Sequence, residues 1–285
     1  MSGLGQRSAG ERAVPIRTEG VAASLGRIYA VTANTVREAG RTRIFSGLLV
    51  AAGALIGFSL LLSDLALVDQ KARLVQDFGL FVIPLLTVLT AVILGAVLLH
   101  KEIEKKTLYA ILPKPVRRGE FLLGKFVGLC LLLGVQVVVL GCCWLLVLLL
   151  RGGEVTAPLL TALALSYVEV IVITAVATFF SALSSPVLSG VMTSGLFLVG
   201  RISYVLTDLM AAQKGVFVEV PAMRALGRAL VTVVPDLSTF HIADEVLLGW
   251  QVPTDYLLSA AGYGASWTAL FLLLAVLAFE RRDLV

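Results

Sequence analysis

Six long apolar runs alternate with polar segments along the chain. A helix needs about 20 largely apolar residues to cross roughly 30 Å of hydrocarbon, where no other open backbone satisfies its own hydrogen bonds. Each run meets that length, so the pattern predicts an all-α, polytopic membrane protein with six transmembrane helices. The predicted spans are residues 44–62, 78–99, 126–150, 158–182, 186–206 and 256–279.

An amphipathic pattern precedes the first span. Its apolar side is formed by Leu25, Ile28, Thr32, Val36 and Ala39, and its polar side by Arg27, Asn34, Glu38 and Arg41. This pattern favours an N-terminal helix lying in the inner membrane interface over a cytoplasmic extension of the first span. Residues 1–20 lack periodicity and are rich in Ser, Gly, Arg and Glu, which predicts a disordered cytoplasmic tail. Residues 21–285 are expected to form a single transmembrane domain.

Composition supports membrane insertion and argues against a soluble catalytic core. The chain has 285 residues, of which 58% are hydrophobic and 15% charged, and its mean hydropathy is +0.96. Cys130, Cys142 and Cys143 all lie in one apolar run, where packing is their ordinary role and the spacing supports neither a disulfide nor a copper site. No metal or cofactor site is predicted in this chain, and no removable signal peptide is expected.

The distribution of positive charge predicts the orientation. Of 23 Lys and Arg residues, seven precede the first span, seven lie in the connector of residues 100–125, and two follow the last span. Positive charge is retained in the cytoplasm, so both termini and this connector should be cytoplasmic, in a bacterial inner membrane. Residues 207–255 then form the longest external segment, with a short helix that stops at Pro235.

The connector contains the stretch GEFLLGKF, which satisfies all but the last position of a nucleotide-binding pattern. In that pattern a Ser or Thr hydroxyl after the Lys ligates magnesium, and a buried strand precedes the loop. Here Phe126 follows Lys125, and charged residues precede Gly119. ATP binding by this chain is therefore not expected.

A short helix is predicted inside the connector from Glu102 to Leu112, because these residues favour helices and Pro113 and Pro115 end it. So small a loop cannot bury the apolar stripe of this helix. The helix therefore lies on the membrane surface or enters a groove on another protein, and the residues alone leave both open.

Residues 102–125 closely resemble the segment after the second span in permease subunits of type-2 ABC exporters. The resemblance is carried by Glu104, Thr107, Leu108, Leu112, Pro115, Val116, Arg118, Glu120, Leu123, Gly124 and Lys125. It implies that the connector holds a cytoplasmic coupling helix between spans two and three, which docks into a separate ATPase. The implied coupling residues are Glu104, Thr107, Leu108, Leu112, Pro115 and Arg118. ATP and magnesium then belong to the partner ATPase, and Lys106 departs from the Gly that is common in the family.

Three further segments resemble a subgroup that includes the permeases of nitrous-oxide-reductase copper maturation and of gliding motility. They are residues 180–186, residues 235–240, with Asp236 where Asn is usual, and residues 279–284. The resemblance covers Arg27 to Leu284. In such proteins hydrolysis moves a solute or drives a periplasmic partner mechanically, and the sequence leaves this choice open.

Glu169 and Arg201 are the candidate residues for gating or for the substrate path. Glu169 lies near the middle of the fourth span, where a carboxylate must face the bundle, a cavity or a partner. A structural role, bonded to Ser or Thr hydroxyls, is the alternative. Arg201 lies near the outer end of the fifth span, with an expected axial offset from Glu169 of about 9 Å. A long side chain can span this offset if the two helices face one another, so an ion pair between Arg201 and Glu169 is one hypothesis. Ser189, Gly190, Thr193, Ser194 and Gly195 suggest close packing of this span against a second copy or another span.

The expected function is that of a non-catalytic permease subunit, a homodimer that works with a separate ABC ATPase. A membrane-embedded enzyme is the first alternative, but His100 and His241 lie on opposite sides of the predicted membrane and HExxH is absent. A secondary transporter is the second alternative, and it would ordinarily show inverted repeats and broken-helix pairs. No nucleic-acid signature is present.

Overall fold

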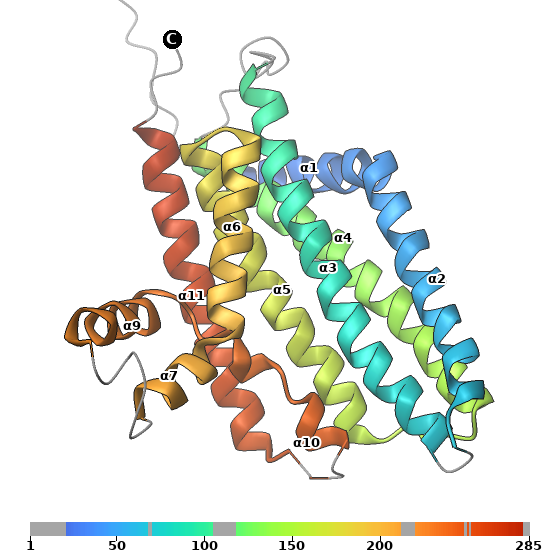
Figure 1. The fold of residues 1–285 in the computed structure, drawn as a ribbon. Helices are drawn as coiled ribbons and strands as arrows, with labels where there is room; N and C mark the ends of the chain where they lie inside the picture. Colours follow the sequence, from blue (N-terminus) through green and yellow to red (C-terminus); the bar gives the residue numbers. More distant parts are fainter. Residues whose placement is uncertain are drawn as a thin grey trace, which may run out of the picture.

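The computed structural model describes residues 21–67, 70–104, 118–211, 220–247, 250 and 252–281. The part of the chain so described forms helices and no strand. Figure 1 shows their arrangement. The α-helices are α1 Val21–Gly40, α2 Arg43–Leu65, α3 Lys71–Glu104, α4 Arg118–Leu150, α5 Ala157–Leu183, α6 Pro186–Arg201, α7 Ser203–Ala211, α9 Pro221–Val233, α10 Ala243–Leu247 and α11 Thr254–Glu280, and η2, Leu237–Phe240, is a short 3-10 helix.

Five described helices, α2, α3, α4, α5 and α11, are long and apolar enough to cross a membrane. The pair formed by α6 and α7 passes the same test together, with a bend of 48° between its halves, and brings the total to six. The prediction of an all-helical, polytopic membrane protein is confirmed. Several helices extend beyond the predicted spans; α4, for example, begins at Arg118 and not at Phe126.

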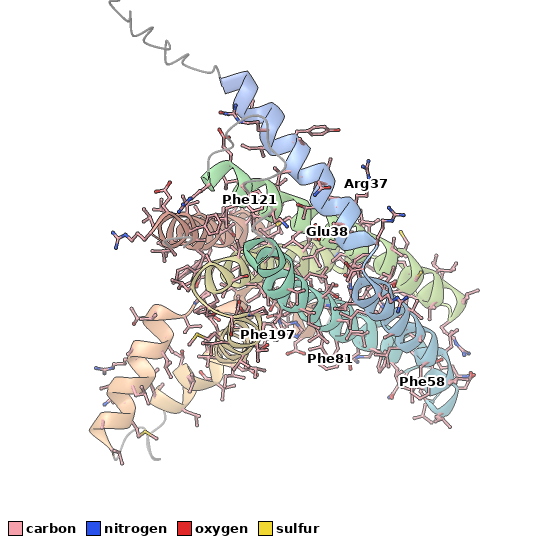
Figure 2. The ribbon with its side chains drawn as sticks, turned by 90° about the horizontal axis from the view of Figure 1, so that it is seen from above. Arg37, Glu38, Phe58, Phe81, Phe121 and Phe197 are labelled. Carbon is pink, nitrogen blue, oxygen red and sulfur yellow. The ribbon has the colours of Figure 1, made fainter. Side chains whose placement is uncertain are left out.

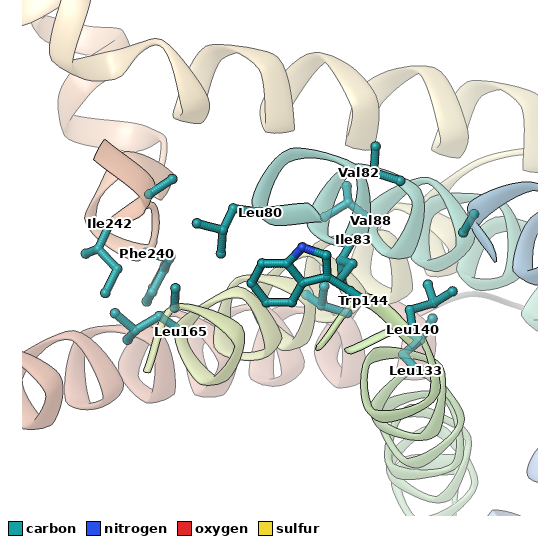
Figure 3. Close-up of a cluster of buried hydrophobic side chains, with 14 of the residues drawn as sticks. Leu80, Val82, Ile83, Val88, Leu133, Leu140, Trp144, Leu165, Phe240 and Ile242 are labelled. Atoms are coloured by element: carbon teal, nitrogen blue, oxygen red, sulfur yellow. The ribbon is translucent and has the colours of Figure 1, made fainter. Parts of the chain in front are cut away.

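The largest core cluster joins α3, α4 and α5, and Trp144 of α4 lies within it. Figure 3 shows the indole among Leu80, Ile83 and Leu165. Trp144 is fully buried, and its Nε1 donates a hydrogen bond of 2.8 Å to the carbonyl oxygen of Val75. The large ring and its single polar atom are thus both satisfied inside the bundle.

α1 is a separate helix that crosses the first turns of α4, as Figure 2 shows from above. Gly124 and Gly128 make the close approach possible. An added Cβ would lie 2.7 Å from Val31 Cβ at Gly124 and 2.7 Å from Thr35 Cβ at Gly128. Thr32 Oγ1 also donates to the Gly124 carbonyl oxygen at 3.1 Å. The GEFLLGKF stretch is therefore part of a helix that packs through small residues, and it does not form a phosphate-binding loop.

α6 ends at Arg201, five residues before the predicted end of the fifth span at Leu206. A tertiary contact lies at this end of the helix. An added Cβ at Gly200 would lie 2.6 Å from the Pro235 carbonyl oxygen, so the segment before η2 packs directly on the end of α6. The helix breaks at Ile202 and the chain continues sideways as α7.

The small residues of α6 divide between two faces. Ser189 and Thr193 are buried, and Ser189 Oγ donates to the Ala177 carbonyl oxygen of α5 at 3.4 Å. Gly190 and Gly195 have open space at the Cβ position, and they line an apolar groove of about 650 Å³ between α3 and α6. Packing against another span is thus observed for one face, while the other is open.

Candidate functional site

Glu169 of α5 and Arg201 of α6 form a buried ion pair. Arg201 Nη1 donates to Glu169 Oε1 at 2.8 Å, and the Glu169 side chain is 1% exposed against 24% for Arg201. Both lie at nearly the same distance from the tight turn between their helices, about 21 Å and about 22 Å along the axis at 1.5 Å per residue. The expected offset of about 9 Å is wrong, because it was counted from the outer ends of two predicted spans of unequal length and not from the turn that they share. Among the described residues, no Ser or Thr hydroxyl bonds to Glu169.

His241 extends this pair into a row of three polar groups. Arg201 Nη2 lies 2.7 Å from His241 Nδ1. A guanidinium only donates, so Nδ1 accepts and the ring proton lies on Nε2. Burial lowers the pKa of His241 below its ordinary 6.5, and the charge of Arg201 lowers it further, against opposing effects of Asp244 and Asp77. His241 is therefore neutral at pH 7, and the charge of Arg201 is balanced by Glu169.

Asp236 fixes the segment that carries His241. Its Oδ1 accepts hydrogen bonds from Ser238 N at 3.0 Å, from Ser238 Oγ at 2.6 Å and from Ser203 Oγ of α7. Its backbone N–H donates to Tyr263 Oη of α11 at 2.8 Å. The Asp236 side chain thus caps η2 and joins it to α7, and the backbone N–H of Asp236 joins the same segment to α11.

A cavity of about 620 Å³ lies next to the row. Side chains from α3, α6, α7, α10, α11 and the loop after η2 line it, among them Phe81, Arg201, Tyr204, His241, Glu245 and Tyr256. The cavity combines aromatic rings with charged groups. Part of its lining comes from α7 and α10, whose places in the fold can be followed in Figure 1.

Residues 60–284 match the family model described as ABC-2 family transporter protein. The chain belongs to the ABC-2 transporter family. No curated protein matches the chain. Membership indicates that this protein is a permease-type transport component of an ABC transporter, as predicted. The match does not distinguish subgroups, so the likeness to the copper-maturation and gliding-motility permeases stays a prediction.

The predicted coupling residues of this ABC-2 permease lie mostly outside the described residues. Thr107, Leu108, Leu112 and Pro115 belong to residues 105–117, and Glu104 is the last residue of α3. Arg118 begins α4, and its Nη1 donates to the carbonyl oxygens of Phe279 and Glu280 at 3.4 and 3.2 Å. It thus binds the C-terminal end of α11, where a positive charge is favourable.

Glu120, two residues after Arg118, ties α4 to α1. Arg27 Nε donates to its Oε2 at 2.8 Å and Arg27 Nη2 to its Oε1 at 2.9 Å, while Ser24 Oγ donates to Oε1 at 2.7 Å. A two-pronged guanidinium–carboxylate contact of this kind fixes orientation as well as distance. The first turn of α4 in the permease is therefore bonded to two other helices, α1 and α11.

The sequence singled out Glu169 and Arg201, whose role in gating or in the substrate path stays a prediction, but it did not point to His241 beside Arg201 or to Asp236 in the same segment. His241 appeared only as a lone histidine of the external segment. The signal that pointed to its surroundings was the resemblance of residues 235–240 to a subgroup motif. The geometry now gives that motif a physical role, since Asp236 positions the loop that brings His241 to Arg201.

Proposed function

We propose that this chain is the membrane subunit of an ATP-driven ABC exporter, with both termini on the cytoplasmic side of the inner membrane. The observation that carries the proposal is the family match over residues 60–284, which includes the whole connector between α3 and α4. In this proposal residues 105–117 contain the coupling helix and dock into a separate ATPase. The ATPase binds ATP and magnesium and hydrolyses the ATP, and the permease provides the path by which the substrate crosses the membrane.

The bonds at the start of α4 support a route for the movement. A displacement of the connector pulls on Arg118 and Glu120, which are bonded to α11 and α1. α4 and α5 share one packed core around Trp144, and α5 carries Glu169 near its middle. Packed cores move between discrete arrangements and do not deform continuously. In this proposal, movement of the connector therefore shifts the row of Glu169, Arg201 and His241 between a state in which the three side chains are in contact and a state in which they are separated.

A second copy of the chain is proposed on the face formed by α3 and α6. Large apolar side chains are exposed there at helical spacing, Phe81, Leu85 and Leu89 on α3, and Val187, Val191 and Leu198 on α6. The apolar groove with Gly190 and Gly195 separates these two rows. Phe81 also lines the polar cavity, and charged groups beside lipid are costly. Two copies joined here would turn their polar cavities toward one route and away from hydrocarbon.

The coupling proposal is tested by co-purification. The intact chain is compared with a variant in which Glu104, Leu108 and Leu112 are changed to Ala, and the recovered proteins are identified and assayed for ATP hydrolysis. The matched control changes Leu146, Leu149 and Leu150 to Ala, three exposed positions at the opposite end of α4. Recovery of an ATPase with wild type and control, but not with the connector variant, supports coupling. If the folded wild type recovers no ATPase, the coupling proposal is refuted.

The dimer proposal has its own test. Val191→Cys is introduced after the native cysteines Cys130, Cys142 and Cys143 have been replaced by Ala. Oxidation in membranes should give a disulfide-linked dimer with this variant. Leu146→Cys, exposed on α4, is the control and should stay monomeric under the same conditions. A dimer that forms only through Leu146→Cys would place the second copy elsewhere.

A further inference from the structure

We propose that the outer cavity binds a protonated organic amine, with the ammonium group at Asp244 and Glu245 and the apolar body against aromatic rings. This inference rests on the proposed function, since it assigns a substrate class to the same outer opening. It is carried by the charge balance of the cavity, by an acceptor without a donor, and by the aromatic lining.

The charge balance leaves the cavity negative at neutral pH. Arg201 is the cationic side chain of the lining, and Glu169 pairs with it at 2.8 Å. The His241 ring is neutral because its Nδ1 accepts from Arg201. Asp244 and Glu245 also line the cavity, and no described Lys or Arg forms an ion pair with either carboxylate. An anion would be repelled there, and a cation attracted.

Glu245 supplies a more specific observation. Its Oε2 is buried, and no described residue donates a hydrogen bond to it. A buried acceptor without a donor costs free energy, and native structures satisfy almost all such atoms. The Glu245 side chain as a whole is partly exposed and lines the cavity. In this proposal the carboxylate turns toward the cavity, where a ligand with an N–H⁺ group satisfies the oxygen and balances the charge. This favours an amine with N–H donors over a cation that has none.

The aromatic lining points to the other half of the ligand. Phe81, Tyr204 and Tyr256 come from α3, α7 and α11 and line the same cavity. The hydroxyl of Tyr256 is already used, donating to the Thr239 carbonyl oxygen at 2.7 Å, so its position is fixed. Rings of this kind attract cations at their faces and bury apolar groups. The volume of about 620 Å³ is within the range of sites for small organic molecules.

A metal ion fits the site less well. Among the described residues, no group of three or more His, Cys, Asp and Glu side chains is arranged to hold a metal. Asp236 is close in sequence, but its Oδ1 already accepts three hydrogen bonds. The lining of carboxylates and rings is thus suited to an organic cation.

The test uses the full-length chain in nanodiscs of phosphatidylcholine, with ethidium as a fluorescent cation that carries N–H donors and fluorescein as a planar anion. Saturable binding is expected for ethidium and not for fluorescein. Glu245→Gln and Asp244→Asn should each weaken ethidium binding at least about tenfold, since each removes a charge at the ligand. Asp255→Asn, which removes an exposed charge outside the cavity lining, should leave binding unchanged.

A competition experiment on the wild type keeps the proposal open to refutation even if a cavity variant fails to fold. Phenethylamine should displace ethidium, and 2-phenylethanol, which lacks the ammonium group, should not. Equal displacement by both, equal binding of fluorescein, or unchanged binding in folded Glu245→Gln would overturn the inference. Recovery of the ATPase without amine binding refutes this inference alone. Amine binding without any recovered ATPase refutes the proposed coupling and leaves the amine site standing.

Discussion

Removing Arg201 should destabilise the protein more than removing Glu169, although the two residues form one ion pair. Arg201→Gln leaves the Glu169 carboxylate, which is 1% exposed, buried without its cation. Glu169→Gln leaves a guanidinium that is 24% exposed, and this group keeps its contact with His241. An uncompensated buried charge is the costlier defect, so the asymmetry in burial decides the order.

The size of the effect follows from the burial. Breaking a buried ion pair by removing one partner costs about 3–5 kcal/mol, and this range applies to Arg201→Gln. Glu169→Gln should cost about 1–2 kcal/mol, since the remaining Arg201 is partly solvated and an amide oxygen can still accept from it. Replacing both residues by Gln leaves no unpaired charge, so the double variant should be more stable than Arg201→Gln alone.

The assay is thermal unfolding of the purified chain, followed by the loss of the monodisperse peak on size exclusion. For a chain of this size the cost predicted for Arg201→Gln corresponds to a shift of about 6–20 °C. Arg224→Gln, at an exposed position of α9, is the control and should shift the midpoint by no more than about 2 °C. Equal losses in the two single variants, or a double variant whose loss is the sum of both, would refute the reasoning.

Four further predictions concern three glycines and His241. Gly128→Ala should loosen α1 from α4 and expose α1 to limited proteolysis, because the added Cβ overlaps Thr35. Gly57→Ala, where the Cβ meets open space, should instead stabilise its helix by up to about 1 kcal/mol. Gly79→Ala should lower the unfolding temperature and change the fluorescence of Trp144, since the added Cβ falls on the indole; an unchanged spectrum would contradict the described packing. The pKa of His241 is below 6.5 in the folded protein, whereas in the unfolded chain it has its ordinary value of 6.5. The contribution of the neutral His241 ring to stability is therefore present above pH 6.5 and is lost as the pH falls toward the folded-state pKa. His241→Gln should flatten this part of the stability profile, and an unaltered slope would assign the titration to another group.

Much of the helix content could be predicted because it depends on local properties of the chain. A run of about 20 apolar residues has few alternatives in hydrocarbon, so each predicted span falls on an observed helix, although α3 and α4 begin seven and eight residues before the predicted spans. The separate α1 followed from its amphipathic period, and the end of α9 before Pro235 followed from the missing N–H of proline. These are one-dimensional signals, so no tertiary information was needed.

The candidate site could be predicted only in part. Glu169 and Arg201 were identifiable one at a time, because an isolated charge in an apolar run is costly wherever it points. Their contact was a hypothesis that required the two helices to face one another, and the sequence alone does not give the rotation of packed helices. The structure places both residues at nearly the same distance from the turn between α5 and α6, with 2.8 Å between Arg201 Nη1 and Glu169 Oε1.

The sequence by itself therefore determined that this protein crosses the membrane, where most of its helices lie, and which charges need partners, because hydrophobicity and helix signals are properties of short segments. Only the tertiary structure decided that Glu169, Arg201 and His241 form one row, that Asp236 positions the segment that carries His241, and that a cavity lined by aromatic and charged side chains lies beside this row. These residues come from segments far apart in the chain, and the relative depth and rotation of packed helices, which no local period encodes, bring them together.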